Sequence, residues 1–247
     1  MTRFLTWHRR PLCGFDLETT GTDPETARIV TGCVIRYGGG QPTRAQTWLA
    51  DPGVEIPAAA TAVHGYTTEA ARSAGRPAPA AVEEIIAALA AAADAGLPLV
   101  VMNANYDFTL LDREARRYGL TPLFDRVAPC VLDPRVLDKQ VDRFRRGGRT
   151  LADLCSHYVV RLDGAHSADA DAAAACAVVW KIANRHRWLT ERPLGELHEE
   201  QVRWAAEQAA GLRDHFVRTG RPHLAEGVRL DWPVIPYRES AVTGDVR

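Results

Sequence analysis

Two carboxylates stand two residues apart in the segment Phe15-Asp16-Leu17-Glu18. Alternate residues of a strand share a face, so Asp16 and Glu18 are predicted to project side by side. Phe15 and Leu17 then project from the other face, into the core. Paired carboxylates repel each other unless a cation lies between them, and hard divalent cations prefer such oxygen ligands. Two acids at this spacing are common in proteins. By themselves they belong to an exposed strand edge more often than to a metal site.

Two more segments carry acids that could join this pair. Asp107 stands at the start of a predicted helix, directly after the apolar residues 99–102. An acid there also stabilises the helix dipole, so this position alone has a structural explanation. His166 precedes an alanine-rich helix that carries Asp171, and a capping histidine with a surface acid is the alternative. Asp169 competes with Asp171, because residues two apart on a helix do not face the same point.

The three segments together carry a resemblance that none of them carries alone. They are Phe-Asp-Leu-Glu-Thr-Thr-Gly at 15–21, Asn-Ala-Asn-Tyr-Asp at 103–107 and His-x4-Asp at 166–171. In this order they resemble the three motifs of the DEDDh 3′→5′ exonuclease family, which includes the proofreading epsilon subunit of bacterial DNA polymerase III. The resemblance covers residues 11–185, and Tyr106 stands where the family more often has Phe.

This resemblance implies a ribonuclease H-like fold and a metal-dependent reaction. The residues that would hold two Mg²⁺ or Mn²⁺ ions are Asp16, Glu18, Asp107 and Asp171. Two such ions clamp the attacking and leaving oxygens of an in-line displacement. His166 would be the general base, because the ordinary pKa of imidazole, about 6.5, is close to working pH. The implied reaction releases nucleoside 5′-monophosphates from single-stranded or frayed 3′ ends of DNA.

Other functions fit the same motifs. An exoribonuclease of the same family would carry the same site residues, because local pocket shape senses the 2′-OH. A polymerase-associated proofreading subunit is a further alternative within this chemistry. A catalytically silent binding module is a third, but the presence of all five candidate catalytic residues argues against it.

Further residues are expected to contact the nucleic acid. Residues 63–67, Val-His-Gly-Tyr-Thr, resemble the family segment that lines the pocket for the terminal nucleotide. Phe108 either stacks on a terminal base or belongs to the core. Arg149 ends a basic run that begins at Arg143, which either tracks phosphates or forms a solvated loop. The candidate substrate-binding residues are Thr19, Thr20, Gly21, His64, Gly65, Tyr66, Asn103, Phe108 and Arg149.

The elements that must position these residues follow from the periodicity of the apolar side chains. Strands at 11–17, 28–36 and 44–50, joined by short turns, predict an antiparallel meander. Helices and two short strands follow. The expected helices are 78–95, 107–118, 134–141, 150–158, 167–185 and 195–218, and the further strands are 98–102 and 129–133. This order predicts an α/β fold in which helices flank a mixed sheet of three antiparallel strands and additional parallel strands.

The pattern divides the chain into an exonuclease domain at 11–185 and a helical extension with a tail at 186–247. The helix at 195–218 carries an apolar stripe, which either packs on its own domain or docks a polymerase or another protein. The tail from Pro222, rich in Pro and Gly, is expected to end in partly disordered chain.

The composition narrows the class of protein further. A net charge of −1 provides no global positive field, which disfavours a protein that coats duplexes. No apolar run approaches the roughly 20 residues that span a bilayer, and the first residues do not resemble a signal peptide. The five cysteines include no CxxC pair, which favours reduced thiols. We therefore expect a cytoplasmic protein that does not associate with membranes.

Overall fold

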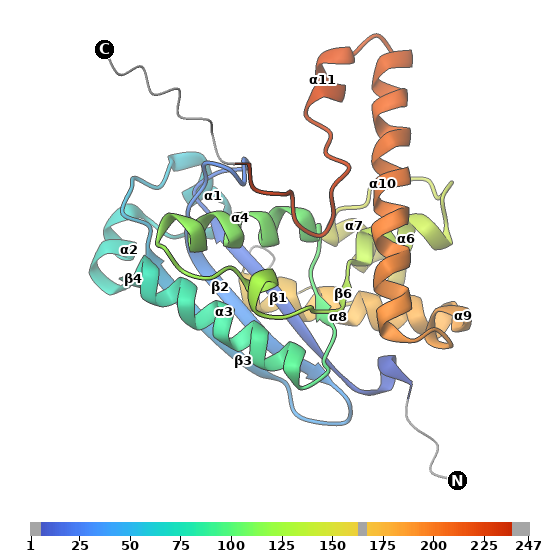
Figure 1. Cartoon of the computed structure of the whole chain (residues 1–247), viewed down its shortest axis with the longest axis horizontal. Helices are drawn as coiled ribbons and strands as arrows, with labels where there is room; N and C mark the ends of the chain where they lie inside the picture. Colours follow the sequence, from blue (N-terminus) through green and yellow to red (C-terminus); the bar gives the residue numbers. More distant parts are fainter. Residues whose placement is uncertain (1–5, 163–166, 239–247) are drawn as a thin grey trace.

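A mixed sheet forms the centre of the protein (Figure 1). The computed structural model describes residues 6–162 and 167–238. The strand order is β4-β3-β2-β1-β5-β6. The strands are β1 (Pro11–Thr19), β2 (Ile29–Gly38), β3 (Arg44–Asp51), β4 (Arg76–Pro77), β5 (Leu99–Val100) and β6 (Val131–Leu132). The pairs β1–β2 and β2–β3 are antiparallel, whereas β5 joins β1 and β6 in parallel, so the predicted mixed sheet and its meander are confirmed.

Helices cover both faces of this sheet. Two of them, α3 (Ala78–Asp94) and α4 (Ala104–Arg117), pack with the odd-numbered residues of β1 in one apolar cluster. On the opposite face, α7 (Leu151–Tyr158) and α8 (Ala168–Arg185) form a second cluster. The other helices are η1 (Trp7–Arg9), α1 (Ala58–His64), α2 (Thr68–Ala74), α5 (Leu123–Arg126), α6 (Pro134–Val141), α9 (Arg187–Thr190), α10 (Leu194–Arg218) and α11 (Pro222–Glu226).

The face of α3 shows why the apolar periodicity predicts these helices. Its residues Val82, Ile85, Ile86 and Leu89 recur at helical spacing, and each side chain is fully buried against the sheet. Burial of such a stripe supplies most of the stability of a helix in a protein. The alanine-rich sequence therefore forms a helix here because one of its faces is apolar.

The helix α10 packs on the rest of the chain through its first half. Leu197 and Gln201 are fully buried, and Trp204 packs against both apolar clusters. Farther along, Leu212 is 39% exposed, where α10 extends away from the sheet beside α11 (Figure 1). Of the two expected roles for its apolar stripe, packing on its own chain is therefore confirmed for the first half.

The segment that follows α11 returns to the core. Trp232 is 8% exposed and belongs to the cluster of α3 and α4. The backbone N–H of Ile235 donates to Thr109 Oγ1 at 2.9 Å. This part of the expected tail thus packs on the domain. Within residues 6–162 and 167–238, no helix combines the length and the apolar character needed to cross a bilayer.

Candidate active site

Three carboxylates converge where β1 ends and α8 begins. Asp16, Glu18 and Asp171 each offer an oxygen, and these oxygens lie within 4.8 Å of one another. Asp16 and Glu18 occupy even-numbered positions of β1, on the face that α8 covers. Asp171 lies in the first turn of α8. Strand alternation and one helix start therefore bring together acids that are more than 150 residues apart in the sequence.

Gly14 permits this close approach of α8 to β1. A Cβ atom at position 14 would lie 2.7 Å from the carbonyl oxygen of Ala172 and 2.9 Å from Sγ of Cys176. Side chains do not tolerate contacts this short, so α8 can sit directly on the strand only where a glycine stands. The glycine lies two residues before Asp16, and Ala172 directly follows Asp171. It therefore sets the distance between the two parts of the cluster.

Asp107 lies in α4 and contacts the end of β1, the strand that carries Asp16 and Glu18. It lies in the first turn of α4 and is 5% exposed. Its Oδ1 accepts a hydrogen bond of 3.1 Å from the backbone N–H of Leu17, the residue between Asp16 and Glu18. The structure thus places Asp107 beside the three converging carboxylates.

The electrostatics of the cluster favour a bound cation. Burial raises the pKa of Asp16 well above its usual range, and the charges of Asp107, Asp171 and Glu18 raise it further. Burial, followed by the charge of Asp171, raises the pKa of Glu18 to about 7. Carboxylates that repel one another are stabilised by a divalent cation, and an all-oxygen set suits Mg²⁺ or Mn²⁺. The residues present fit a hard divalent cation.

The third motif is described only in part. His166, the expected general base, lies outside the described residues. Asp169, which competes with Asp171, is exposed and accepts a hydrogen bond from the hydroxyl of Ser167. Of the two acids in the first turn of α8, Asp171 is therefore the one that joins Asp16 and Glu18.

Tyr106 stabilises the turn after Glu18. The sequence comparison with the family noted this residue only because Phe is more common there. The hydroxyl of Tyr106 lies 2.6 Å from Oγ1 of Thr19 and donates to the carbonyl oxygen of Gly21. The hydroxyl of Thr19 also donates to Gly21, at 2.7 Å. Thr20 Oγ1 accepts from the backbone N–H of Arg28 at 2.9 Å. Tyr106 thereby connects the start of α4 to the end of β1, a role that a phenylalanine could not have.

The segment around His64 reaches the same turn. Gly65 ends α1 with a φ of 82°, a conformation that favours glycine, and its N–H donates to Thr61. The N–H of Tyr66 donates to His64 Nδ1 at 3.1 Å. Burial lowers the pKa of His64, while the backbone of Thr19 acts in the opposite direction. His64 thus lies beside Thr19, and the ring of Tyr66, 37% exposed, lies next to it.

Phe108 belongs to the core, so the prediction that it stacks on a terminal base is wrong. Its side chain is 1% exposed, and its ring centroid lies 5.6 Å from that of Phe15 and 5.2 Å from that of Phe124. Asp107, its neighbour, faces the site, so Phe108 is turned about 100° away from it around the helix axis.

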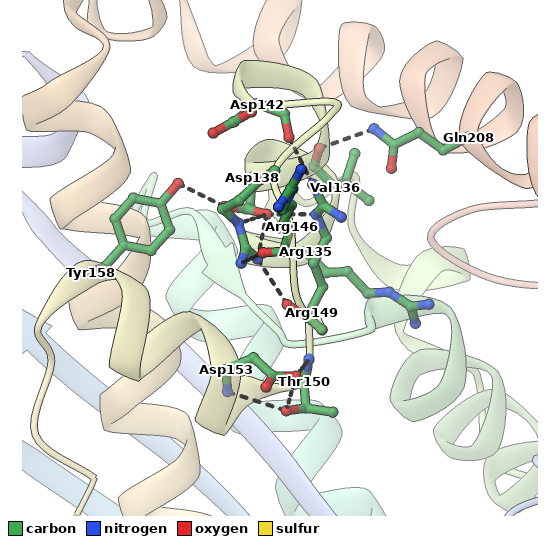
Figure 2. A network of polar contacts seen from close by, with 12 residues as sticks. Arg135, Val136, Asp138, Asp142, Arg146, Arg149, Thr150, Asp153, Tyr158 and Gln208 are labelled. Carbon is green, nitrogen blue, oxygen red and sulfur yellow. Dashed lines mark hydrogen bonds and ion pairs between the residues drawn. The ribbon is translucent and has the colours of Figure 1, made fainter.

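Arg149 forms an ion pair inside the protein. The predictions of a free phosphate contact and of a solvated loop are therefore both wrong for this residue. Its Nε lies 2.7 Å from Oδ2 of Asp138, whose side chain is fully buried. Its Nη2 donates to the carbonyl oxygen of Asp142 at 2.7 Å. Figure 2 shows Asp138 between Arg149 and Tyr158, whose hydroxyl donates to Oδ1 at 2.8 Å.

Asn103 positions the side chain of Arg135, a residue that the sequence analysis did not identify as a candidate. Its backbone is left-handed, with φ 61° and ψ 48°, at the start of α4. Asparagine tolerates this conformation better than most residues. Its Oδ1 accepts from Nη1 of Arg135 at 2.8 Å. Arg135 precedes the basic run by eight residues, so only its isolated position at the start of α6 could have indicated it.

Three solved structures share this arrangement of elements. Escherichia coli Exonuclease I in complex with a dT13 oligonucleotide has a TM-score of 0.61 and 18% identity, over 73% of this chain and 42% of that chain. A moderately thermophilic Exonuclease I from Methylocaldum szegediense has a TM-score of 0.58 and 20% identity, over 72% and 41%. Exonuclease X in complex with 5′ overhanging duplex DNA has a TM-score of 0.54 and 18% identity, over 76% and 99%. At these identities the likeness shows a shared fold, and this chain spans less than half of either Exonuclease I.

The family itself is shown by the sequence. No curated protein sequence matches the chain. The family model RNase_T, described as Exonuclease, matches residues 13–179, a span that contains every carboxylate of the cluster. Since this match covers more than half of the chain, the protein belongs to the Exonuclease (RNase_T) family.

Proposed function

We propose that the protein is a metal-dependent 3′→5′ exonuclease that hydrolyses phosphodiester bonds at single-stranded or frayed 3′ ends of DNA and releases nucleoside 5′-monophosphates. The observation that carries the proposal is the convergence of Asp16, Glu18 and Asp171 within 4.8 Å in a chain of the Exonuclease family. DNA as the substrate is supported by the fold shared with Exonuclease I and Exonuclease X, whose structures contain DNA.

The carboxylates divide the work of holding two Mg²⁺ or Mn²⁺ ions. Asp16 would serve both ions, Glu18 and Asp171 would complete the first site, and Asp107 would support the second. When bound, the ions activate water and stabilise the charge that develops on the phosphoryl group. Asp107 also fixes the direction of β1 through Leu17, so it orients the two acids on either side of that residue.

His166 acts as the general base that takes the proton of the attacking water. An imidazole is suited to this because its ordinary pKa is close to neutral pH. Thr19, Thr20, Gly21 and the segment 64–66 form the pocket for the terminal nucleotide. Replacing His166 with Ala should lower kcat strongly while metal affinity, measured by calorimetry, is largely kept. A loss of metal affinity without any further loss of kcat at saturating metal would make His166 a ligand instead.

The function is tested by digestion of matched oligonucleotides. Single-stranded DNA, paired duplex, mismatched duplex and RNA, each labelled at either end, are incubated with Mg²⁺ or Mn²⁺ and wild-type protein or Asp16→Ala. We expect stepwise shortening from the 3′ end, fastest on single-stranded and mismatched DNA, and its abolition by Asp16→Ala. Activity that survives Asp16→Ala overturns the mechanism. A preference for RNA replaces the DNA assignment with an exoribonuclease.

A further inference from the structure

A cavity of about 500 Å³ is lined by residues at the start of α4, the helix that carries Asp107. Its walls come from the start of α4, from α6, from α10 and from residues 227–235, which descend from α11 towards α4 (Figure 1). Pro24 and Tyr106 line one end of it. Because the hydroxyl of Tyr106 contacts Thr19 and Gly21, this end adjoins the turn that follows Glu18. We call this cavity the α6–α10 groove.

Cationic side chains dominate the charged lining of the groove. The lining cations are Arg135, Lys139, Arg149 and Arg229, and the lining acids are Asp133 and Asp231. The carboxylate of Asp133 already accepts hydrogen bonds from other groups of the protein. It accepts from the backbone N–H groups of Ala104 and Arg135 at 3.0 and 2.8 Å, and from Nε1 of Trp232 at 3.4 Å. The groove therefore presents a surplus of positive charge.

A buried carboxylate fixes part of this charge in place. Asp138 pairs with Arg149 at 2.7 Å and with Arg145 at 3.1 Å, and one carboxylate cannot neutralise two guanidinium groups. Burial lowers the pKa of Lys139, and the charges of Arg149, Arg143 and Arg135 lower it further. The cations around α6 thus repel one another, and an anion between them would relieve that repulsion.

The remaining walls suit the apolar parts of a nucleotide. Ala205, Ala209 and Leu212 of α10 also line the groove, and Gln208 of the same helix donates to the carbonyl oxygen of Val136 at 3.1 Å. Single-stranded nucleic acids bind where a positive groove follows the backbone and apolar surfaces meet the bases. The α10 wall and residues 227–235 lie beyond residue 179, where the family match ends.

We propose that the α6–α10 groove binds the phosphodiester backbone of the substrate strand on the 5′ side of the bond that is cleaved. The inference rests on the proposed exonuclease function. It adds to the catalytic site an extended binding surface for the nucleic-acid strand. Arg135, Lys139 and Arg229 contact phosphates, while Arg149 is held by Asp138 and adds to the local positive field. The enzyme should therefore favour strands long enough to reach the groove over a dinucleotide.

The test compares two groove variants with a matched control. Lys139→Gln and Arg229→Gln each remove one charge, the second at an exposed position whose replacement does not disturb packing. Lys181 is the only other lysine of the chain; it lies on α8 outside the groove lining and is half-buried like Lys139, so Lys181→Gln is the control. The slope of log kcat/KM against log salt is measured with Mg²⁺ for dT12, and kcat/KM is also measured for a thymidine dinucleotide.

Each groove variant should lower the steepness of the dT12 salt slope by about 0.7, the value for one phosphate contact on a single strand. The ratio of kcat/KM for dT12 to that for the dinucleotide should fall in both variants and stay at the wild-type value in Lys181→Gln. Slopes and ratios equal to those of Lys181→Gln in both groove variants would overturn the groove while leaving the exonuclease intact. If wild-type protein hydrolyses neither substrate, the proposed function itself fails.

Discussion

Protons and metal ions compete for the same carboxylates at the catalytic cluster. Burial and mutual repulsion raise the pKa of Asp16, and that of Glu18 rises to about 7. A group with a raised pKa in the folded state stabilises the fold below its ordinary pKa, and this stabilisation is lost as the pH rises through the folded-state value. For Glu18 the loss runs from about pH 4.5 to about pH 7 in the metal-free protein.

Bound metal should therefore stabilise the protein more in alkaline than in acidic solution. At about pH 8 the Glu18 carboxylate is charged and is repelled by Asp171 without a cation, whereas near pH 5 its proton relieves this repulsion. Melting temperatures are compared with Mg²⁺ and with EDTA at about pH 5 and about pH 8. The increase caused by Mg²⁺ should be larger at the higher pH and should shrink in Glu18→Gln. An equal increase at both pH values would contradict this account of the cluster.

The sequence predicts which face of β1 carries the acids, because strand alternation depends on neighbouring residues alone. It does not predict which way Phe108 points, since this depends on how α4 is rotated against the sheet. Nor does it predict the partner of Arg149: Asp138 is eleven residues away, and its burial results from the packing of α6. Side-chain roles that depend on tertiary contacts thus lie beyond sequence patterns.

Among the elements, the contact between α8 and β1 decides the geometry of the cluster. Gly14→Ala should force α8 away from the strand, because the new Cβ would meet Ala172 and Cys176 at less than 3 Å. Overpacking of this kind costs about 1–3 kcal/mol of unfolding free energy. The shift also moves Asp171, so exonuclease activity should fall with stability.

Gly211 of α10 provides the matched control. A Cβ there meets no atom of the described residues within 4 Å, so Gly211→Ala should be neutral or stabilise the protein by up to about 1 kcal/mol. Urea denaturation monitored by circular dichroism measures both variants. Equal stability of the two variants would show that α8 does not rest on Gly14.

The elements that the sequence identifies are those with a buried apolar stripe, such as α3, α8 and the three long strands. The helices α1 and α2 were not predicted because they lack such a stripe. No residue of α1 is buried, and Ala71 is the buried residue of α2. Their ends are instead set by local features, Gly65 after α1 and the side chain of Thr67 before α2, which hydrogen-bonds the N–H of Ala70.

At the scale of the whole molecule, we propose that residues 11–185 form the exonuclease domain and that 186–247 is an extension, whose described residues up to 238 are stabilised by packing on this domain. Trp232 supports this because it reaches the core cluster of α3 and α4. Arg113 of α4 donates to the carbonyl oxygen of Ile235 at 2.9 Å and pairs with Glu25, in the loop after β1. Arg113 of α4 therefore links the extension to the loop that follows the first motif.

Trp232→Ala should destabilise the entire protein in a single unfolding transition. Loss of a buried tryptophan costs about 3–5 kcal/mol, whereas Trp188, 39% exposed, should cost much less when changed to Ala. Denaturant titrations followed by fluorescence and by circular dichroism, which report on tryptophans and helices in both parts of the chain, should give coincident transitions. Two separate transitions in the wild-type protein, or unchanged stability in Trp232→Ala, would mean that the extension folds independently.

The central claim is that the converging carboxylates perform metal-dependent hydrolysis, and the two neighbouring acids of α8 test it most directly. Asp171→Asn and Asp169→Asn remove the same charge from the same helical turn, but only Asp171 lies in the cluster. The measurement is the rate at which each variant releases mononucleotide from 3′-labelled single-stranded DNA with saturating Mg²⁺.

Asp171→Asn should lower this rate by at least about a hundredfold. Mutation of residues that only hydrogen-bond to metal ligands already lowers metal affinity or activity by about 10–100-fold. Asp169→Asn should remain close to the wild-type rate. Comparable rates for the two variants, or a larger loss in Asp169→Asn, would contradict the assignment of the catalytic site.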